Sequence, residues 1–324
     1  MTSSTIRIGT RHWDHLIPLA LGDVPATENL RVERSEATPD LWQDDHLDAS
    51  ETSLSKYVRA RAAGDTRVVA LPVFLMRAFR HRCIIVRKDS PFTHPAELRD
   101  ARIGLTGWPD SGNTWTRAIL RAEGVGVDDA HWRVGRLTAA HPVEDRIGIA
   151  SPPASVRPVS GDKPLVDGLL DSTLDAVMTP FMPPGFHQAD SRLRPLFEDT
   201  RAAERAYFGE HGFIPGIHLL AVKQAVLDEH PGLAQQLVDT FDVARRLAFA
   251  RRQKLMDVTP WQNEEIAETI RFFGHDWLTY GWRHDAQMVD AFQHELHAQG
   301  LLDTPLDAAD LFPHQIEPTT ESAA

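Results

Sequence analysis

The segment LPVFLMRAFRHRCIIV, residues 71–86, sets four basic side chains into a strongly apolar stretch: Arg77, Arg80, His81 and Arg82. An unpaired charge is costly to bury, so these side chains either face solvent or line a cleft that holds an anion. At helical spacing Arg77, Arg80 and His81 lie on one face and form a cationic patch. The segment follows a predicted strand, and open α/β sheets bind ligands at the carboxyl ends of their strands. This position favours a ligand site over a solvated basic surface.

Strand and helix patterns alternate through the first half of the chain. Residues 5–10, 67–72 and 83–88 read as strands, because β-branched and other apolar residues dominate them. Residues 53–65 and 110–125 read as helices with polar caps and a glycine stop. This alternation predicts an α/β fold with a largely parallel sheet.

The second half changes character. Residues 141–164 hold many Pro, Gly and Ser and are predicted to form a long loop. Apolar residues at helical spacing then recur in 233–256, 263–274 and 285–300. The tail after Pro313 is predicted to be disordered.

Length and charge limit the class of protein. At 324 residues the chain exceeds a typical single domain and predicts two lobes. Its net charge of -12 argues against nucleic-acid binding, so a site for an anion must be local. The one cysteine, Cys83, allows no intrachain disulfide. The N-terminal residues lack the apolar core of a signal peptide, and no apolar run reaches the roughly 20 residues of a spanning helix, which predicts a cytoplasmic protein without membrane contacts.

Several polar residues carry the expected chemistry. Arg77 and Arg80 can bind carboxylates in a bidentate manner, and His81 and His218 can transfer protons near neutral pH. Residues 110–114, DSGNT, precede a predicted helix, where backbone N–H groups form either a carboxylate site or an ordinary cap.

Two acidic residues follow predicted strands, and their roles stay open. Asp14 and Glu51 either pair with arginines and hold substrate hydroxyls or serve as ordinary turn and helix-start residues. No group of His, Cys, Asp and Glu has metal-ligand spacing, so no metal is expected.

Motifs spread over the chain resemble the 4,5-dihydroxyphthalate decarboxylase family. The most specific is LPVFLMRAFRHR at residues 71–82, and the similarity runs from about residue 13 to about residue 302. The other matching motifs, in chain order, are ETSLSKYV, ARIGLTGW with TWTRAIL, LDAVMTP, FIPGIHLLAV, TPWQ, FFGHDWLTYGW and QGLL.

The resemblance implies a two-lobed type 2 periplasmic-binding-protein-like fold with an interlobe cleft and C-terminal helices. Lobe 1 would comprise residues 1–86 and 218–312, lobe 2 residues 87–217, and the disordered tail residues 313–324. Hinge strands would lie near 83–86 and 218–222.

The implied activity is cofactor-independent decarboxylation of a hydroxylated aromatic acid such as 4,5-dihydroxyphthalate. A general acid, His81 or His218, would protonate the ring carbon that loses CO2. The resemblance places the following residues around the substrate: Phe74, Arg77, Arg80, Asp14, Glu51, Ser53, Asn113, Thr114, Trp115, Arg117 and Thr179, with Trp108 as a further ring-stacking candidate.

Departures from the family pattern and two alternatives accompany this interpretation. Arg82 stands where the family usually has Ser, and residues 108–118 differ from the family pattern, which leaves room for a different substrate. The alternative is a solute-binding protein for an aromatic or other small carboxylate, built on the same fold; lyase chemistry of the kind found in menaquinone-pathway relatives is a further option. A homo-oligomer is compatible with the sequence.

Overall fold

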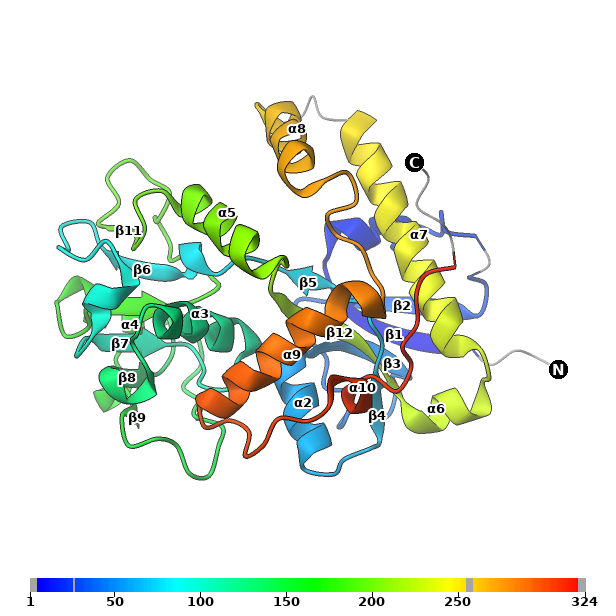
Figure 1. Cartoon of the computed structure of the whole chain (residues 1–324), viewed down its shortest axis with the longest axis horizontal. Helices are drawn as coiled ribbons and strands as arrows, with labels where there is room; N and C mark the ends of the chain where they lie inside the picture. Colours follow the sequence, from blue (N-terminus) through cyan, green and yellow to red (C-terminus); the bar gives the residue numbers. More distant parts are fainter. Residues whose placement is uncertain (1–4, 26, 255–258, 320–324) are drawn as a thin grey trace.

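Two β-sheets divide the chain into two lobes (Figure 1). The computed structural model describes residues 5–25, 27–254 and 259–319. The first sheet has the order β2-β1-β3-β12-β4, with β5 beside β12, and the second has the order β11-β6-β10-β7-β8-β9. The strands of the first sheet are β1 (Ile6–Arg11), β2 (Leu30–Ser35), β3 (Ala49–Ser53), β4 (Val68–Ala70), β5 (Met76–Arg77) and β12 (Gly216–Lys223). Those of the second are β6 (Ile84–Arg87), β7 (Arg102–Leu105), β8 (His131–Val134), β9 (Val156–Pro158), β10 (Ala176–Met178) and β11 (Leu193–Pro195).

Helices cover both sheets and supply the C-terminal part of the chain. The α-helices are α1 (Ile17–Ala20), α2 (Leu54–Ala62), α3 (Ser111–Ala122), α4 (Leu165–Leu170), α5 (Thr200–His211), α6 (Gln224–Glu229), α7 (Leu233–Lys254), α8 (Gln262–Phe273), α9 (Trp282–Ala298) and α10 (Ala308–Leu311). Short 3-10 helices are η1 (Asp14–Leu16), η2 (His81–Cys83), η3 (Pro95–Leu98), η4 (Val127–Asp129) and η5 (Ser160–Asp162).

The two sheets are mixed, which differs from the expected largely parallel arrangement. Strand β1 is parallel to β2 and β3, and β7 is parallel to β8 and β10. The antiparallel pairs involve β12 in the first sheet and β6 in the second. These two strands enter their sheets directly from the other lobe, without the helical crossover that links parallel neighbours within one lobe.

The chain crosses between the lobes twice. The first crossing lies between β5 and β6, and the second between α5 and β12. The sequence placed residues 83–86 in the hinge, but β6 pairs with β10 and β11 and is part of the second sheet. The predicted fold class, two α/β lobes with C-terminal helices, is confirmed.

A hydrophobic core continues across the lobe boundary. Helix α7 packs on η1 and α1 of the first lobe, whereas α9 contacts α3 of the second (Figure 1). Trp115 of α3 lies 5.1 Å from Phe292 of α9 and 5.7 Å from Phe213, measured between ring centroids. These contacts fix the position of α3, whose first turn faces the interlobe cleft.

The segment after Pro313 is held by contacts as far as it is described. Ile316 accepts a backbone hydrogen bond from Trp282 at 3.1 Å, and the backbone N–H of Thr319 donates to Asp239 at 2.7 Å. The expectation of disorder therefore does not fit residues 313–319, and residues 320–324 lie outside the described part.

Candidate active site

A cleft of about 620 Å³ lies between the lobes. The first lobe contributes the carboxyl ends of β1 and β3, the start of α2, strand β5 and the start of β12. The second contributes the first turn of α3, the segment after β10 and part of the long loop 141–164. The cleft thus lies where open α/β sheets bind their ligands.

Arg80 is a buried cation in the wall of this cleft. Its residue is 1% exposed, and its Nε donates to the carbonyl of Gly112 at 3.2 Å. Neither Nη group has a hydrogen-bond partner among the described residues. Burial lowers the pKa of Arg80, and the charge of Arg82 adds to this shift, whereas Cys83 and Asp110 oppose it. A guanidinium in this state gains most from an anion, because a carboxylate satisfies both its charge and its free N–H groups.

The first turn of α3 adjoins Arg80. The side-chain Nδ2 of Asn113 donates to the carbonyl of Gly107 at 2.8 Å, and its buried Oδ1 has no partner among the described residues. Ser111 joins the lobes here, since its hydroxyl lies 2.7 Å from the hydroxyl of Ser53 and accepts from the N–H of Ser55 at 2.9 Å. This end of the cleft combines a cation with the positive end of a helix dipole.

Glu51 and His218 form a carboxylate–histidine pair on the first sheet. His218 of β12 lies opposite Ser53 of β3, so Glu51, two residues earlier, is its diagonal neighbour on the same face. The Nδ1 atom of His218 is 2.5 Å from Oε1 of Glu51. His218 lines the cleft, and its Nε2 has no hydrogen-bond partner among the described residues.

Further contacts keep Glu51 ionised although it is fully buried. Its Oε2 accepts from the backbone N–H of Arg11 and from Nε1 of Trp13, both at 2.8 Å. Burial alone would raise the pKa of Glu51, but the hydrogen bond and charge of His218, aided by these two donors, lower the pKa below its ordinary value. A fixed carboxylate of this kind orients the imidazole and stabilises its protonated form.

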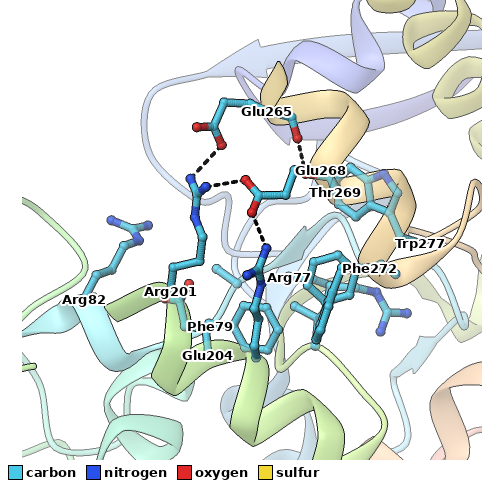
Figure 2. Close-up of a pocket in the computed structure, with 14 residues that line it drawn as sticks. Arg77, Phe79, Arg82, Arg201, Glu204, Glu265, Glu268, Thr269, Phe272 and Trp277 are labelled. Atoms are coloured by element: carbon cyan, nitrogen blue, oxygen red, sulfur yellow. Dashed lines mark hydrogen bonds and ion pairs between the residues drawn. The ribbon is translucent and has the colours of Figure 1, made fainter. Parts of the chain in front are cut away.

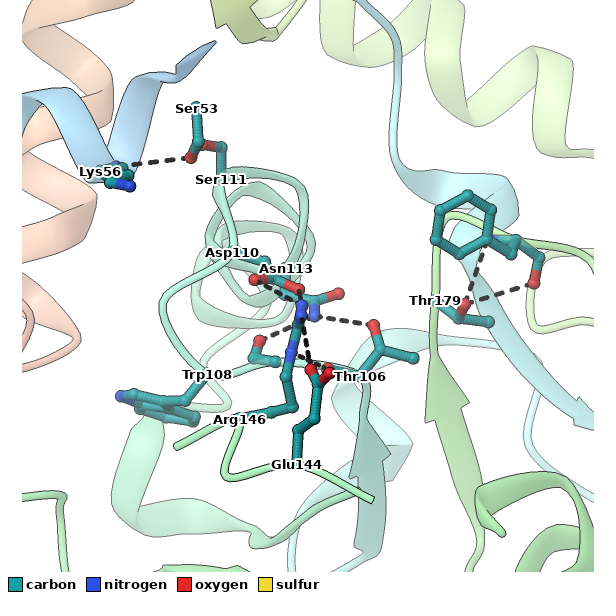
Figure 3. A network of polar contacts seen from close by, with 12 residues as sticks. Ser53, Lys56, Thr106, Trp108, Asp110, Ser111, Asn113, Glu144, Arg146 and Thr179 are labelled. Atoms are coloured by element: carbon teal, nitrogen blue, oxygen red, sulfur yellow. Dashed lines mark hydrogen bonds and ion pairs between the residues drawn. The ribbon is translucent and has the colours of Figure 1, made fainter. Parts of the chain in front are cut away.

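Charged residues surround the mouth of the cleft. Arg146, from the long loop, donates to Asp110 at 3.1 Å beside the start of α3 (Figure 3). Lys56 pairs with Asp40 at 2.6 Å. The guanidinium of Arg11 lies 5.0 Å from the centre of the Trp13 ring and forms no salt bridge to a described residue.

The three basic residues expected on one helical face point to three different places. The chain forms strand β5 and then the 3-10 helix η2 here, so helical spacing does not apply. Arg77 forms an ion pair with Asp285 of α9 in which both side chains are almost fully buried. Arg80 turns into the cleft, whereas His81 packs edge-on against Phe197 and Tyr207 on the other side of the wall.

Four predicted substrate contacts belong to the packing around α3 and the core. The Nε1 of Trp115 donates to the carbonyl of Gly216 at 2.8 Å. Arg117 lies over the ring of Trp108 and donates to Gln299 at 2.7 Å. The remaining two are Phe74, which is fully buried and packs on Phe312, and Thr114, whose hydroxyl donates to the carbonyl of Asp110.

Asp14 and Thr179 also lie outside the lining of the cleft. Asp14 is bound to His15 and Arg252, and its hydrogen bond with His15, followed by the charge of Arg252, lowers its pKa to about 2 against the opposing effect of burial. The Thr179 hydroxyl accepts from the N–H of Phe181 at 3.1 Å and fixes the turn that carries Phe181 into the cleft.

The sequence argument did not find two of the lining residues, Arg146 and Phe181, which come from segments without recognisable motif spacing. Arg11 and Trp13 belong to RHWD, residues 11–14, a segment that the family resemblance also brings to the cleft. For Arg11 and Trp13 a signal existed, because they directly follow the first predicted strand at its carboxyl end. Arg146 had none, since a long loop does not reveal where it folds back.

A smaller cavity, of about 350 Å³, lies on the outside between α5 and α8 (Figure 2). Arg201 pairs there with Glu265 and Glu268, and Arg205 pairs with Glu268. Arg77 borders this cavity, but its charge is matched by Asp285. Because carboxylates already compensate these arginines, this cavity is a weaker anion site than the cleft.

The part of the chain that the structure describes contains no group of three or more His, Cys, Asp or Glu residues arranged to hold a metal ion. In residues 5–25, 27–254 and 259–319, no helix has both the length and the apolar character needed to cross a membrane.

Solved structures similar to this chain share its two-lobed fold. The periplasmic aliphatic sulphonate-binding protein SsuA of Escherichia coli superposes with a TM-score of 0.57 at 14% identity, over 99% of this chain and 96% of that one. The desulfurization enzyme DSZB gives a TM-score of 0.55 at 16% identity, over 95% and 96% of the two chains. Fold and cleft thus define a protein of the type 2 periplasmic-binding-protein-like class.

The chain is also similar in sequence to two curated proteins. The chain is 29% identical over 321 residues to a 4,5-dihydroxyphthalate decarboxylase of Comamonas testosteroni, covering 96% of this chain and 97% of the relative. It is 31% identical over 163 residues to a 4,5-dihydroxyphthalate decarboxylase of Pseudomonas putida, covering 50% and 63% of the two chains. No protein-family model matches. The resemblance seen in the motifs is confirmed, and the relatives that share it are decarboxylases, the enzyme class predicted for this chain.

Proposed function

We propose that this protein removes one carboxylate, as CO2, from a hydroxylated aromatic dicarboxylate of the 4,5-dihydroxyphthalate type, without a cofactor. The observation that carries the proposal is that one cleft holds both the Glu51–His218 pair and the unpartnered guanidinium of Arg80. The names of the curated relatives support the choice of substrate class.

Substrate binding would use the positive end of the cleft. One carboxylate of the substrate accepts from Arg80 and from N–H groups of the first turn of α3. The aromatic ring then lies towards His218, with Trp13 and Phe181 lining the same cleft. The guanidinium fixes the orientation, which lowers the entropic part of the barrier.

His218 would be the proton donor. The imidazolium Nε2 protonates the ring carbon that bears the leaving carboxylate, while a para hydroxyl supplies electron density to the ring. The bond to the carboxylate then breaks, its electron pair restores aromaticity, and CO2 departs. Glu51 stabilises the imidazolium before transfer, and solvent returns a proton to His218 afterwards.

A solute receptor for small carboxylates remains the second candidate, because an unpaired guanidinium in an interlobe cleft serves binding equally well. Incubation with 4,5-dihydroxyphthalate and a panel of hydroxybenzoic and phthalic acids separates the two candidates. We expect CO2 release and, in heavy water, one deuterium on the ring of the product. Ligand that is bound and recovered unchanged across the panel would support the receptor and refute the decarboxylase.

Three variants assign the roles. His218→Asn should retain product binding and lower turnover by roughly 100-fold or more. Arg80→Ala should weaken binding by roughly 10- to 150-fold, the equivalent of one charge-assisted hydrogen bond. His81→Phe is the matched control, since His81 lies outside the cleft lining, and it should turn over normally. Normal turnover by His218→Asn would remove this histidine from the mechanism.

A further inference from the structure

A cavity of about 570 Å³ lies on the far side of the wall that carries Arg80. Helices α3, α5 and α9 and the 3-10 helices η2 and η3 border it, and Figure 1 shows α9 running alongside α3 while α5 lies above them. Helix α3 connects the two cavities, because its first turn lines the cleft and its later turns line this second cavity. Arg80 and His81, which are adjacent in sequence, thus line different cavities.

His81 is the unusual polar group of the second cavity. The residue is 5% exposed, and its buried Nδ1 has no hydrogen-bond partner among the described residues. Its ring meets Phe197 and Tyr207 edge-on at centroid distances of 5.2 and 5.5 Å. Burial, and after it the charge of His211, lowers the pKa of His81 to about 4. The neutral ring therefore keeps at least one buried nitrogen, Nδ1, available for a hydrogen bond with a ligand.

The walls suit a flat apolar ligand. Four aromatic side chains line the cavity, Trp115, Phe197, Tyr207 and Phe213, and five alanines leave room between them. Aromatic walls of this kind favour ring-on-ring contacts in stacked or edge-on geometry. A concave, mainly apolar site with one or two polar groups is the usual form of a small-molecule site.

The rim disfavours anions. Glu123, Glu210 and Glu295 lie on it, and Arg121 is the one arginine among the described lining residues and donates to Glu295 at 2.9 Å. The cleft has the opposite character, with a buried unpaired guanidinium. An aromatic carboxylate therefore prefers the cleft, and an uncharged aromatic molecule prefers the second cavity.

We infer that the cavity between α3, α5 and α9 is a second binding site, for a small uncharged aromatic molecule that carries a hydroxyl group, with His81 as its hydrogen-bond partner. The inference does not depend on the decarboxylase proposal, because it rests on a separate cavity and on a ligand without a carboxylate.

Binding of 4-fluorophenol to the full chain, followed by ¹⁹F NMR, tests the inference. We expect saturable binding with a dissociation constant on the order of 1 mM, as suits a ligand this small. His81→Phe keeps the ring shape and removes both nitrogens, and it should weaken binding roughly 3- to 10-fold, the equivalent of one neutral hydrogen bond. Fluorobenzene, which lacks the hydroxyl, should bind the wild type and His81→Phe equally.

Two further variants locate the ligand. Ala118→Leu fills the cavity from α3 and should abolish saturable binding, whereas His294→Ala, at an exposed histidine of the rim, should leave it unchanged. Arg80→Ala, on the cleft side, should also leave it unchanged. Loss of 4-fluorophenol binding in Arg80→Ala with retention in Ala118→Leu would place the phenol in the cleft and overturn the inference, as would the absence of saturable binding to the wild type.

Discussion

The imidazole of His218 and the carboxylate of Glu51 are joined at 2.5 Å between Nδ1 and Oε1, on adjacent strands of the first sheet. Trp13 and the backbone of Arg11 hold the carboxylate from its other oxygen. This arrangement leaves Nε2 of His218 as the free end of the pair, on the side of the cleft.

Replacing Glu51 with Gln should lower turnover and leave product binding nearly intact. The neutral amide keeps the shape of the side chain but no longer stabilises an imidazolium, and the loss of a charge-assisted hydrogen bond corresponds to roughly 10- to 150-fold. Steady-state kinetics and product titration measure the two effects separately. Glu33→Gln is the matched control, because Glu33 contacts His46 at 3.1 Å on the surface, and it should change neither. Equal losses in binding and turnover for Glu51→Gln would argue against its positioning role.

Replacing Gly112 with Ala should weaken carboxylate binding without removing any charge. A Cβ atom at this position would lie 2.7 Å from Nη2 of Arg80, so the guanidinium must move. We expect phthalate, as a probe, to bind about 10-fold or more weakly in calorimetry. Gly209→Ala, on α5, meets no atom within 4 Å and should bind phthalate as the wild type does. Unchanged affinity in Gly112→Ala would show that the position of Arg80 does not set the anion site.

Removing one partner of the buried Arg77–Asp285 pair should destabilise the fold. Asp285→Leu leaves the buried guanidinium of Arg77 uncompensated and should lower the free energy of unfolding by about 3–5 kcal/mol. Arg77→Leu leaves a buried carboxyl group, whose pKa burial raises to about 7, and should also destabilise the fold. The double variant should be more stable than Asp285→Leu, because no charge remains buried. Denaturant titrations measure these values, and Arg67→Ala, at an exposed ion pair, should change the free energy of unfolding little. Additive losses in the double variant would contradict a coupled buried pair.

The contribution of His81 to stability should fall as the pH is lowered from about 6.5 to about 4. Burial, then the charge of His211, lowers the pKa of His81 from 6.5 to about 4 in the folded chain. Between these values the unfolded chain binds a proton at His81 that the folded chain does not, so the contribution of His81 to the free energy of unfolding rises with pH in this range. The shift corresponds to roughly 3 kcal/mol.

His81→Phe isolates this contribution. Unfolding titrations at pH 7.5, 6 and 5 should show a shallower pH dependence for His81→Phe than for the wild type. Some dependence remains, because burial raises the pKa of Asp285 to about 7, and this group contributes stability that is lost as the pH rises towards 7. Parallel curves for the two proteins would mean that His81 is protonated equally in the folded and unfolded chains.

The sequence by itself determined the local elements and a few residues of the cleft. Helical spacing and polar caps located α2 and α3, and Ser53 caps α2, accepting from the N–H of Lys56. Such features depend on neighbours within a few positions, so the sequence carries them directly. Residue chemistry made Glu51 and His218 candidates, but their contact depends on β3 lying beside β12.

Tertiary structure alone decided the roles of Arg77, Arg80 and His81. Helical spacing places these three residues on one face, so residue pattern alone did not distinguish their surroundings. Pairing of β5 with β12 and the turn into η2 direct Arg77 to Asp285 of α9, Arg80 to Gly112 of α3 and His81 to Tyr207 of α5. Each partner lies more than 30 positions away in the chain, and only the packing of both lobes determines which charge is neutralised and which one remains free for an anion.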